Sequence, residues 1–164
     1  MEHYNSQSYS LRKLASSKKY YRQNLTRAIA ITSGKGGVGK SNITINLGFA
    51  LNSFGKNVTI LDADFGLANV DVLLGKKPSY NINDVFEGRK KIQEIIMEIE
   101  KGLRIIPASS GIEKLANINE ETMKEFISGL KTIEKETDFF LIDTSAGISQ
   151  EVLSLLVSSQ EVIV

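Results

Sequence analysis

Cysteine is absent from this sequence, and histidine occurs once, at His3. The chain therefore has no disulfide framework and no thiolate ligands, and a single histidine in a polar leader does not make a zinc site. Long apolar runs are also missing: no stretch approaches about 18 consecutive apolar residues, and the N-terminus has no hydrophobic signal-peptide core. We therefore expect a cytoplasmic protein without a membrane span or an export signal.

Length and composition suit one globular domain, with 164 residues of which 41% are hydrophobic and 24% are charged. The net charge of +1 is unevenly distributed, because residues 1–27 carry +5 and the remainder carries −4. The leader is also rich in serine, tyrosine and asparagine. We predict a flexible basic segment over residues 1–24 and one folded domain over residues 25–164.

A glycine-rich stretch at residues 33–41 is the strongest signal in the chain. It follows a β-branched run at residues 28–32 and precedes an amphipathic helical pattern, so the sequence predicts strand, loop and helix. Residues 34–41 fit G-x-x-x-x-G-K-[ST], the phosphate loop, in which glycine lets backbone N–H groups curl around phosphate oxygens. The apolar positions predicted to form the helix face are Ile43, Leu47, Ala50, Leu51 and Phe54.

Two side chains of this loop suit a nucleoside triphosphate. Lys40 can reach the β- and γ-phosphates, the Ser41 hydroxyl is placed to ligate Mg²⁺, and the helix start adds its positive dipole end. The predicted nucleotide-binding residues are Gly34, Lys35, Gly36, Gly37, Val38, Gly39, Lys40, Ser41 and Asn42.

A dinucleotide-binding fingerprint is the alternative, since residues 34–39 also fit G-x-G-x-x-G and Asp62 follows about 20 residues later. On that interpretation the protein is a Rossmann-type oxidoreductase. The residues directly after the last glycine favour the phosphate loop, because a dinucleotide pyrophosphate needs neither an ammonium group nor a magnesium-binding hydroxyl there.

The second predicted strand, residues 57–61, ends at a pair of carboxylates, Asp62 and Asp64. Two strands joined by a helix form a right-handed βαβ unit, which predicts a parallel sheet. Ligands of such sheets lie beyond the carboxyl ends of the strands, so both carboxylates are expected beside the loop, where they can organise Mg²⁺ or a water. Helix capping by one of them is the competing interpretation.

The remaining sequence predicts further layers of the same sheet. Residues 75–102 suggest two short surface helices, with a basic cluster at residues 89–91 that is either a solvated face or a site for an anionic partner. Residues 103–106 form a third strand, and a helix capped at Asn119 covers the sheet. Residues 139–143 have the form of a Walker B strand whose Asp143 lands near Mg²⁺. We also expect a helix around residues 152–156 and a fifth strand at residues 161–164, within which the sequence stops.

Several of these motifs together resemble one family. Residues 35–41 look like the deviant Walker A motif of the MinD/ParA group, residues 62–64 resemble its switch I, and residues 143–147 resemble its Walker B and switch II. The resemblance implies an α/β fold, a parallel β-sheet flanked by helices, of the P-loop NTPase class called SIMIBI, here truncated at the C-terminus.

Within that group, residues 62–75 are especially similar to the FlhG family, also called FleN or YlxH, ATPases that govern flagellar number and placement. FlhG leaders carry a D-Q-A-x-x-L-R motif that engages FlhF, a signal-recognition-type GTPase. This leader keeps Gln7, Leu11 and Arg12 of that motif and has serine at the Asp and Ala positions. The resemblance therefore implies that these three residues bind a partner.

The resemblance also implies a slowly hydrolysing ATPase switch that uses ATP/ADP and Mg²⁺ and forms a homodimer with ATP. The implied roles are Lys40 on the phosphates, Ser41 and Asp143 on Mg²⁺, Asp64 on the attacking water and Lys35 on the nucleotide of the opposite subunit. Membrane contact at the cell pole would use a C-terminal helix that this chain lacks. A ParA-like role in DNA partition and a MinD-like role in cell division remain alternatives, and we expect no specific nucleic acid.

Overall fold

The computed structural model describes residues 26–64, 73–108, 120–147 and 159–164. The predicted leader segment at residues 1–24, the cap at Asn119 and the helix around residues 152–156 lie outside this part of the chain. Within the described residues, no helix combines the length and the apolar character that crossing a bilayer requires.

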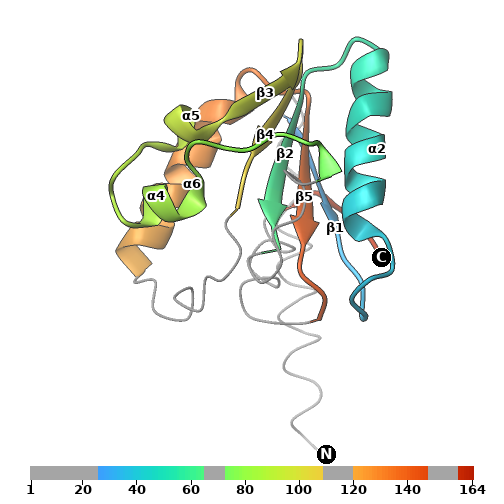
Figure 1. Ribbon diagram of the computed structural model, residues 1–164, viewed down its shortest axis with the longest axis horizontal. Coiled ribbons are helices and arrows are strands. Elements are labelled where there is room, and N and C mark those ends of the chain that lie inside the picture. Colours follow the sequence, from blue (N-terminus) through green and yellow to red (C-terminus); the bar gives the residue numbers. More distant parts are fainter. Residues whose placement is uncertain (1–25, 65–72, 109–119, 148–158) are drawn as a thin grey trace, which may run out of the picture.

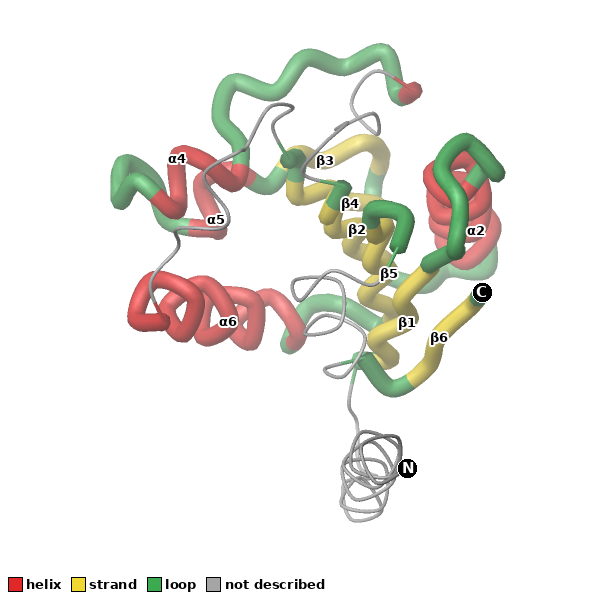
Figure 2. The backbone as a smooth tube through the Cα atoms, turned by 90° about the horizontal axis from the view of Figure 1, so that it is seen from below, coloured by secondary structure: helices red, strands yellow, loops and turns green. Residues whose placement is uncertain are grey.

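The structure is built around a single sheet of six strands, drawn in Figures 1 and 2. The strand order is β3-β4-β2-β5-β1-β6. All neighbours pair in parallel except β3, which is antiparallel to β4. This confirms the predicted α/β fold with a mostly parallel sheet. The strands are β1 (Arg27–Ile31), β2 (Val58–Ala63), β3 (Met97–Glu100), β4 (Leu103–Ile106), β5 (Phe139–Thr144) and β6 (Glu161–Ile163).

Strand β3 was not predicted, because residues 75–102 were expected to hold only short helices. Its side chains alternate, with Met97 and Ile99 packed against the core and Glu98 and Glu100 exposed. The chain then reverses at Gly102, whose φ of +85° is readily adopted only by glycine, and enters β4. In sequence the short apolar set ending at Ile99 fitted a helical spacing as well, and the pairing with β4 decides between them.

Helices cover both faces of the sheet, as Figure 2 shows from the carboxyl ends of the parallel strands. Helix α2 (Lys40–Ser53) lies on one face. Helices α4 (Ile82–Phe86), α5 (Ile92–Ile95) and α6 (Glu120–Glu134) lie on the other. The core accordingly divides into two apolar clusters, one on each side of the sheet.

The predicted apolar face of α2 is wrong at both ends. Ile43 and Phe54 are 51% and 82% exposed, whereas Thr44, Ile45 and Gly48 are buried. A Cβ atom at Gly48 would lie 2.9 Å from Ile60 Cδ1, so the missing side chain lets the helix approach β2 closely. The buried face therefore combines Ile45 with Thr44 and Gly48, two positions that an apolar pattern does not reveal.

The topology places β5 between β1 and β2, although these two are consecutive in sequence. In dinucleotide-binding sheets the first two strands are direct neighbours. The strand order therefore does not support the oxidoreductase alternative. It also sets Asp143 of β5 in register with Ile31 of β1 on one side and with Asp62 of β2 on the other.

Candidate nucleotide and magnesium site

The glycine-rich loop joins β1 to α2 at the carboxyl edge of the sheet. Gly37 and Gly39 have φ values of +70° and +99°, and Gly39 is the N-cap residue of α2. The Ser33 hydroxyl donates a hydrogen bond to the Lys35 carbonyl at 2.6 Å, and the Gly147 amide donates to the Ser33 carbonyl at 3.1 Å. The loop is thus tied to the segment that follows β5.

Two other glycines of the loop have no structural need for glycine within the described chain. Neither Gly34 nor Gly36 has a left-handed φ, and a Cβ atom built on either would meet nothing within 4 Å. The same open space adjoins Gly37 and Gly39. A backbone edge kept bare beside open space suits close approach by a ligand that is not part of the chain, such as phosphate oxygens.

Lys40 and Ser41 open helix α2 directly after this loop. Lys40 is only 8% exposed, which is unusual for a lysine, and Ser41 is half-buried. The first turn of α2 contains no acidic residue, so no side chain there competes for the positive end of the helix dipole. This end of the helix is therefore suited to an anion.

The carboxylates converge on the same edge. Asp62 and Asp143 are 1% and 0% exposed and face each other across the β2–β5 pairing. Asp64 follows β2, and its amide donates to Asp62 Oδ1 at 3.2 Å. The residues that a cap at this point would serve lie outside the described part of the chain, so helix capping by one of the two carboxylates stays an alternative. The Thr144 hydroxyl donates to the Ile31 carbonyl at 2.9 Å and fixes the end of β5 to β1.

Burial raises the pKa of Asp143 above its ordinary value, because removing the carboxylate from water disfavours its charged form. The Ser41 hydroxyl, which lies against the carboxylate, opposes this rise, while the negative charge of Asp64 adds to it. Lys40 and Thr44 act weakly in the lowering direction. These influences show that the side chains of the loop, the helix start and two strand ends come together at Asp143.

One oxygen of that carboxylate, Asp143 Oδ2, is buried and has no hydrogen-bond partner among the described residues. An orphaned, buried carboxylate oxygen beside a serine hydroxyl fits a hard cation that takes oxygen ligands. Within the described ranges, no group of three or more His, Cys, Asp or Glu side chains forms a metal cage. Mg²⁺ commonly binds through one or two carboxylates together with phosphate oxygens and water, so the donor set present here fits that ion.

Besides the exposed glycines Gly34, Gly36 and Gly37, three predicted loop residues have their side chains at the surface. Lys35, Val38 and Asn42 are exposed, and the part of the chain that the structure describes does not bury them. The predicted partner-binding residues, Gln7, Leu11 and Arg12, lie outside the described residues. Thr44, in contrast, was missed: it is fully buried next to Asp143. Its spacing of four positions from Lys40, which puts both residues on one face of the helix, is the sequence signal that could have identified it.

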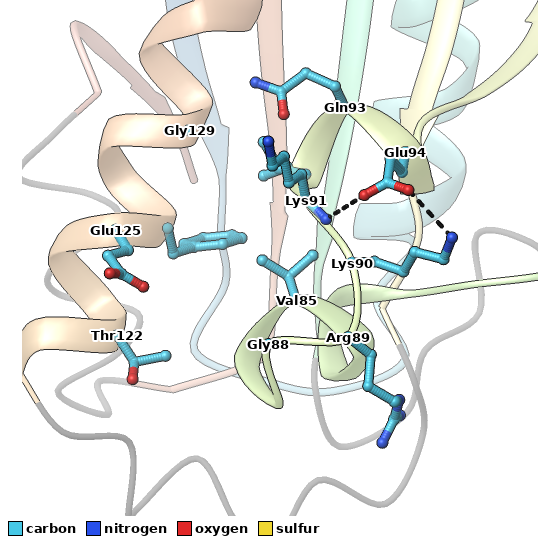
Figure 3. A pocket seen from close by; sticks show the side chains of 12 residues that line it. Val85, Gly88, Arg89, Lys90, Lys91, Gln93, Glu94, Thr122, Glu125 and Gly129 are labelled. Carbon is cyan, nitrogen blue, oxygen red and sulfur yellow. Dashed lines mark hydrogen bonds and ion pairs between the residues drawn. The ribbon is translucent and has the colours of Figure 1, made fainter.

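A groove of about 470 Å³ lies elsewhere, between α4, α5 and α6 (Figure 3). It contains none of the predicted site residues, because it is on the opposite face of the sheet from α2. The basic cluster at residues 89–91 borders it, but Arg89 pairs with Asp84 at 2.8 Å and Lys90 pairs with Glu94 at 3.1 Å. These local ion pairs favour the interpretation of the cluster as a solvated face.

Comparison with known proteins agrees with this architecture. The family model described as an AAA domain matches residues 26–164. The antiactivator FleN of Pseudomonas aeruginosa is 42% identical over 137 residues, covering 84% of this chain and 49% of FleN. The flagellum site-determining protein YlxH of Helicobacter pylori is 45% identical over 140 residues, covering 85% and 47%. The septum site-determining protein MinD of Pyrococcus horikoshii, solved with Mg-ADP, has a TM-score of 0.71 and 32% identity over 84% of this chain and 56% of that structure.

The chain belongs to the AAA-domain family of P-loop proteins. Within it, the relatives identify a MinD/ParA-type protein similar to FleN and YlxH, the FlhG group. The chain spans about half the length of the curated relatives it matches.

Proposed function

We propose that this chain is the nucleotide-binding part of an ATP-dependent dimerisation switch that governs flagellar number and placement. The observation that carries the proposal is the convergence of Lys40, Ser41 and the buried Asp143 beside a loop whose glycines border open space. The flagellar assignment is supported by the similarity to FleN and YlxH.

Each side chain has a role in binding and hydrolysing ATP. The loop amides and Lys40 hold the phosphates, and Ser41 with Asp143 supplies oxygen ligands for Mg²⁺. Asp62 is a further carboxylate for the magnesium ion, because it lies in register with Asp143 on the neighbouring strand. When bound, Mg²⁺ would neutralise charge on the phosphate oxygens. Asp64 orients the attacking water, and the exposed Lys35 reaches the nucleotide of a second copy.

Residues 1–24 act on the partner in this proposal. Gln7, Leu11 and Arg12 bind an FlhF-like GTPase of the signal-recognition type, as the resemblance of the leader implies. The intact protein is cytoplasmic and attaches reversibly to the membrane at the cell pole. Specific nucleic-acid binding has no part in the proposal.

The test uses the intact protein and measures its mass in solution with ATP, with ADP and without nucleotide. We expect a dimer only with ATP and Mg²⁺, and no nucleotide binding in Lys40→Ala, because the phosphates would lose their main cationic partner. A monomer under all conditions, or undiminished binding in Lys40→Ala, contradicts the switch.

The partner is tested with a peptide of residues 1–24 added to a purified FlhF-like GTPase. We expect stimulation of GTP hydrolysis that is lost in Gln7→Ala and Leu11→Ala but kept in Lys18→Ala, whose charge lies outside the motif. Equal loss in all three variants would leave the leader as a generic basic arm.

A role in positioning the division site is the second candidate, because the chain is also 41% identical over 128 residues to the septum site-determining protein MinD of Bacillus subtilis. Deleting the gene in its own host separates the two functions. Altered flagellar number with normal division supports the flagellar role, and misplaced septa with normal flagella support the MinD-like role.

A further inference from the structure

Thr44 is a buried polar side chain to which the proposed function gives no role. It lies one helical turn after Lys40 in α2 and is fully inaccessible to solvent. Its hydroxyl donates to the Lys40 carbonyl at 2.9 Å and lies 3.4 Å from Asp143 Oδ1, so its single proton is shared between the two acceptors in a three-centre hydrogen bond whose longer arm reaches the carboxylate. One hydroxyl therefore contacts the lysine that opens the helix and the carboxylate that ends β5.

We propose that Thr44 is a positioning residue for Asp143: its hydroxyl holds Oδ1 and leaves Oδ2 as the oxygen available to Mg²⁺. The proposal rests on the proposed function, since it concerns the same magnesium site. A carboxylate rotates easily about the bond to its Cβ, because this torsion is broad and not divided into sharp staggered wells. A donor on one oxygen restricts that rotation, so the other oxygen stays directed.

The burial of both groups makes this contact matter. Asp143 is 0% exposed, so bulk water does not orient it, and Oδ2 has no hydrogen-bond partner in the part of the chain that the structure describes. A hydrogen bond to a charged group is stronger in such surroundings than at the surface. Removal of a group that hydrogen-bonds to a metal ligand and orients it typically lowers the metal affinity by about ten- to a hundredfold.

A purely local role for Thr44 is the competing explanation. Threonine in a helix often donates to the carbonyl four residues earlier, as Thr44 does to Lys40, and this alone satisfies the hydroxyl. On that explanation, removal of the hydroxyl would change the melting temperature but not the extent to which magnesium strengthens nucleotide binding. The second contact, 3.4 Å from Asp143 Oδ1, is what a purely local role leaves unused, and the effect of removing the hydroxyl on magnesium affinity separates the two explanations.

The experiment measures the affinity of the intact protein for a fluorescent ATP analogue that resists hydrolysis, once with MgCl₂ and once with EDTA. The ratio of the two affinities is compared for wild type, Thr44→Val, Thr44→Ala and Thr44→Ser. Thr59→Val is the matched control, because Thr59 is equally buried, its hydroxyl contacts Thr137 at 2.9 Å, and it is not part of the site. Melting temperatures are recorded for every variant, and Thr44→Ala provides a second hydroxyl-free variant if Thr44→Val does not fold.

We expect the ratio of the affinity in MgCl₂ to the affinity in EDTA to fall about tenfold or more in Thr44→Val and Thr44→Ala. It should stay close to wild type in Thr44→Ser and Thr59→Val. An unchanged ratio in the hydroxyl-free variants overturns the inference, and so does an equal fall in Thr44→Ser, because that variant keeps the hydroxyl. A wild-type protein that binds the analogue equally with and without magnesium instead overturns the proposed function, and this inference with it.

Discussion

Asp62 and Asp143 are register partners on the neighbouring parallel strands β2 and β5, and both are buried. Two neighbouring buried carboxylates are costly, since each keeps its charge only with favourable partners. Asp143 in particular has a raised pKa and one oxygen that no group of residues 26–64, 73–108, 120–147 or 159–164 hydrogen-bonds. The site is therefore built for a cation at the expense of the stability of the ligand-free protein.

Asp143→Asn should raise the melting temperature of the ligand-free protein at neutral pH by about 2–4 °C, if it relieves on the order of 1 kcal/mol. The sign follows from the raised pKa. Above the folded-state pKa, the folded protein holds a charged carboxylate that it disfavours relative to the unfolded chain, so stability is reduced. This penalty fades as the pH falls through the folded-state pKa toward the ordinary pKa of an aspartate carboxyl, below which both states are protonated.

Thermal scans of wild type and Asp143→Asn between neutral pH and pH about 3.5 check this, and the difference should shrink toward the acid end. Glu98→Gln, at an exposed position on β3, is the matched control. Addition of magnesium and nucleotide should stabilise the wild type more than the variant, because ligands stabilise the state that binds them. A lower melting temperature of Asp143→Asn at neutral pH would contradict the prediction.

Gly36→Ala and Gly39→Ala should separate ligand binding from stability. A methyl group at Gly36 would contact no atom of the described chain, and the φ angle of Gly36 is not left-handed. The free energy of unfolding should therefore change by less than about 0.5 kcal/mol. Gly39 has a φ of +99°, so its alanine variant should lose about 1–2 kcal/mol.

Both substitutions should weaken nucleotide binding at least about tenfold, because a side chain obstructs the approach of phosphate to the backbone amides. Urea denaturation and titration with a fluorescent nucleotide provide the two measurements. Unchanged affinity in Gly36→Ala would mean that the open space beside the loop is not the phosphate site.

Lys35→Ala and Asp64→Ala should block two different steps of the switch. Lys35 is exposed on the loop, so its removal should abolish ATP-dependent dimerisation while binding of ATP to the monomer persists. Asp64 lies at the end of β2 close to Asp143, so its removal should leave a long-lived ATP dimer with hydrolysis reduced by about a hundredfold or more. Light scattering and phosphate release follow the two steps, and normal dimerisation and hydrolysis in Lys35→Ala would make Lys35 a simple solvated residue.

Gly129→Ala should destabilise the protein by about 1–3 kcal/mol through overpacking. The new Cβ atom would lie 2.8 Å from Ile92 Cγ2, and the β-branched side chain of Ile92 has little freedom to move away. The energetic cost should largely disappear in the background Ile92→Ala, which removes the obstructing atom, so a double-mutant cycle measures the coupling. Additive effects of the two substitutions would exclude this contact as the cause.

The sequence by itself determined the local parts of the site. The spacing of glycine, lysine and serine in residues 34–41 allows few structures other than a loop at a helix start, because the required backbone angles and N–H directions are local properties. Likewise, an apolar run that ends in a carboxylate, as at Asp143, predicts a buried strand with an acid at its ligand edge. These patterns were sufficient to predict the α/β fold and the residues to inspect.

The tertiary structure decided which strands are neighbours and which side chains are buried. The insertion of β5 between β1 and β2 brings Asp143 next to Asp62, and the local sequence of neither strand specifies which strand becomes its neighbour. The antiparallel β3 and the burial of Thr44 in place of Ile43 have the same origin. Pairing partners and close helix contacts are set by distant residues, and the free energy of those contacts outweighs the local preferences that a sequence pattern reports.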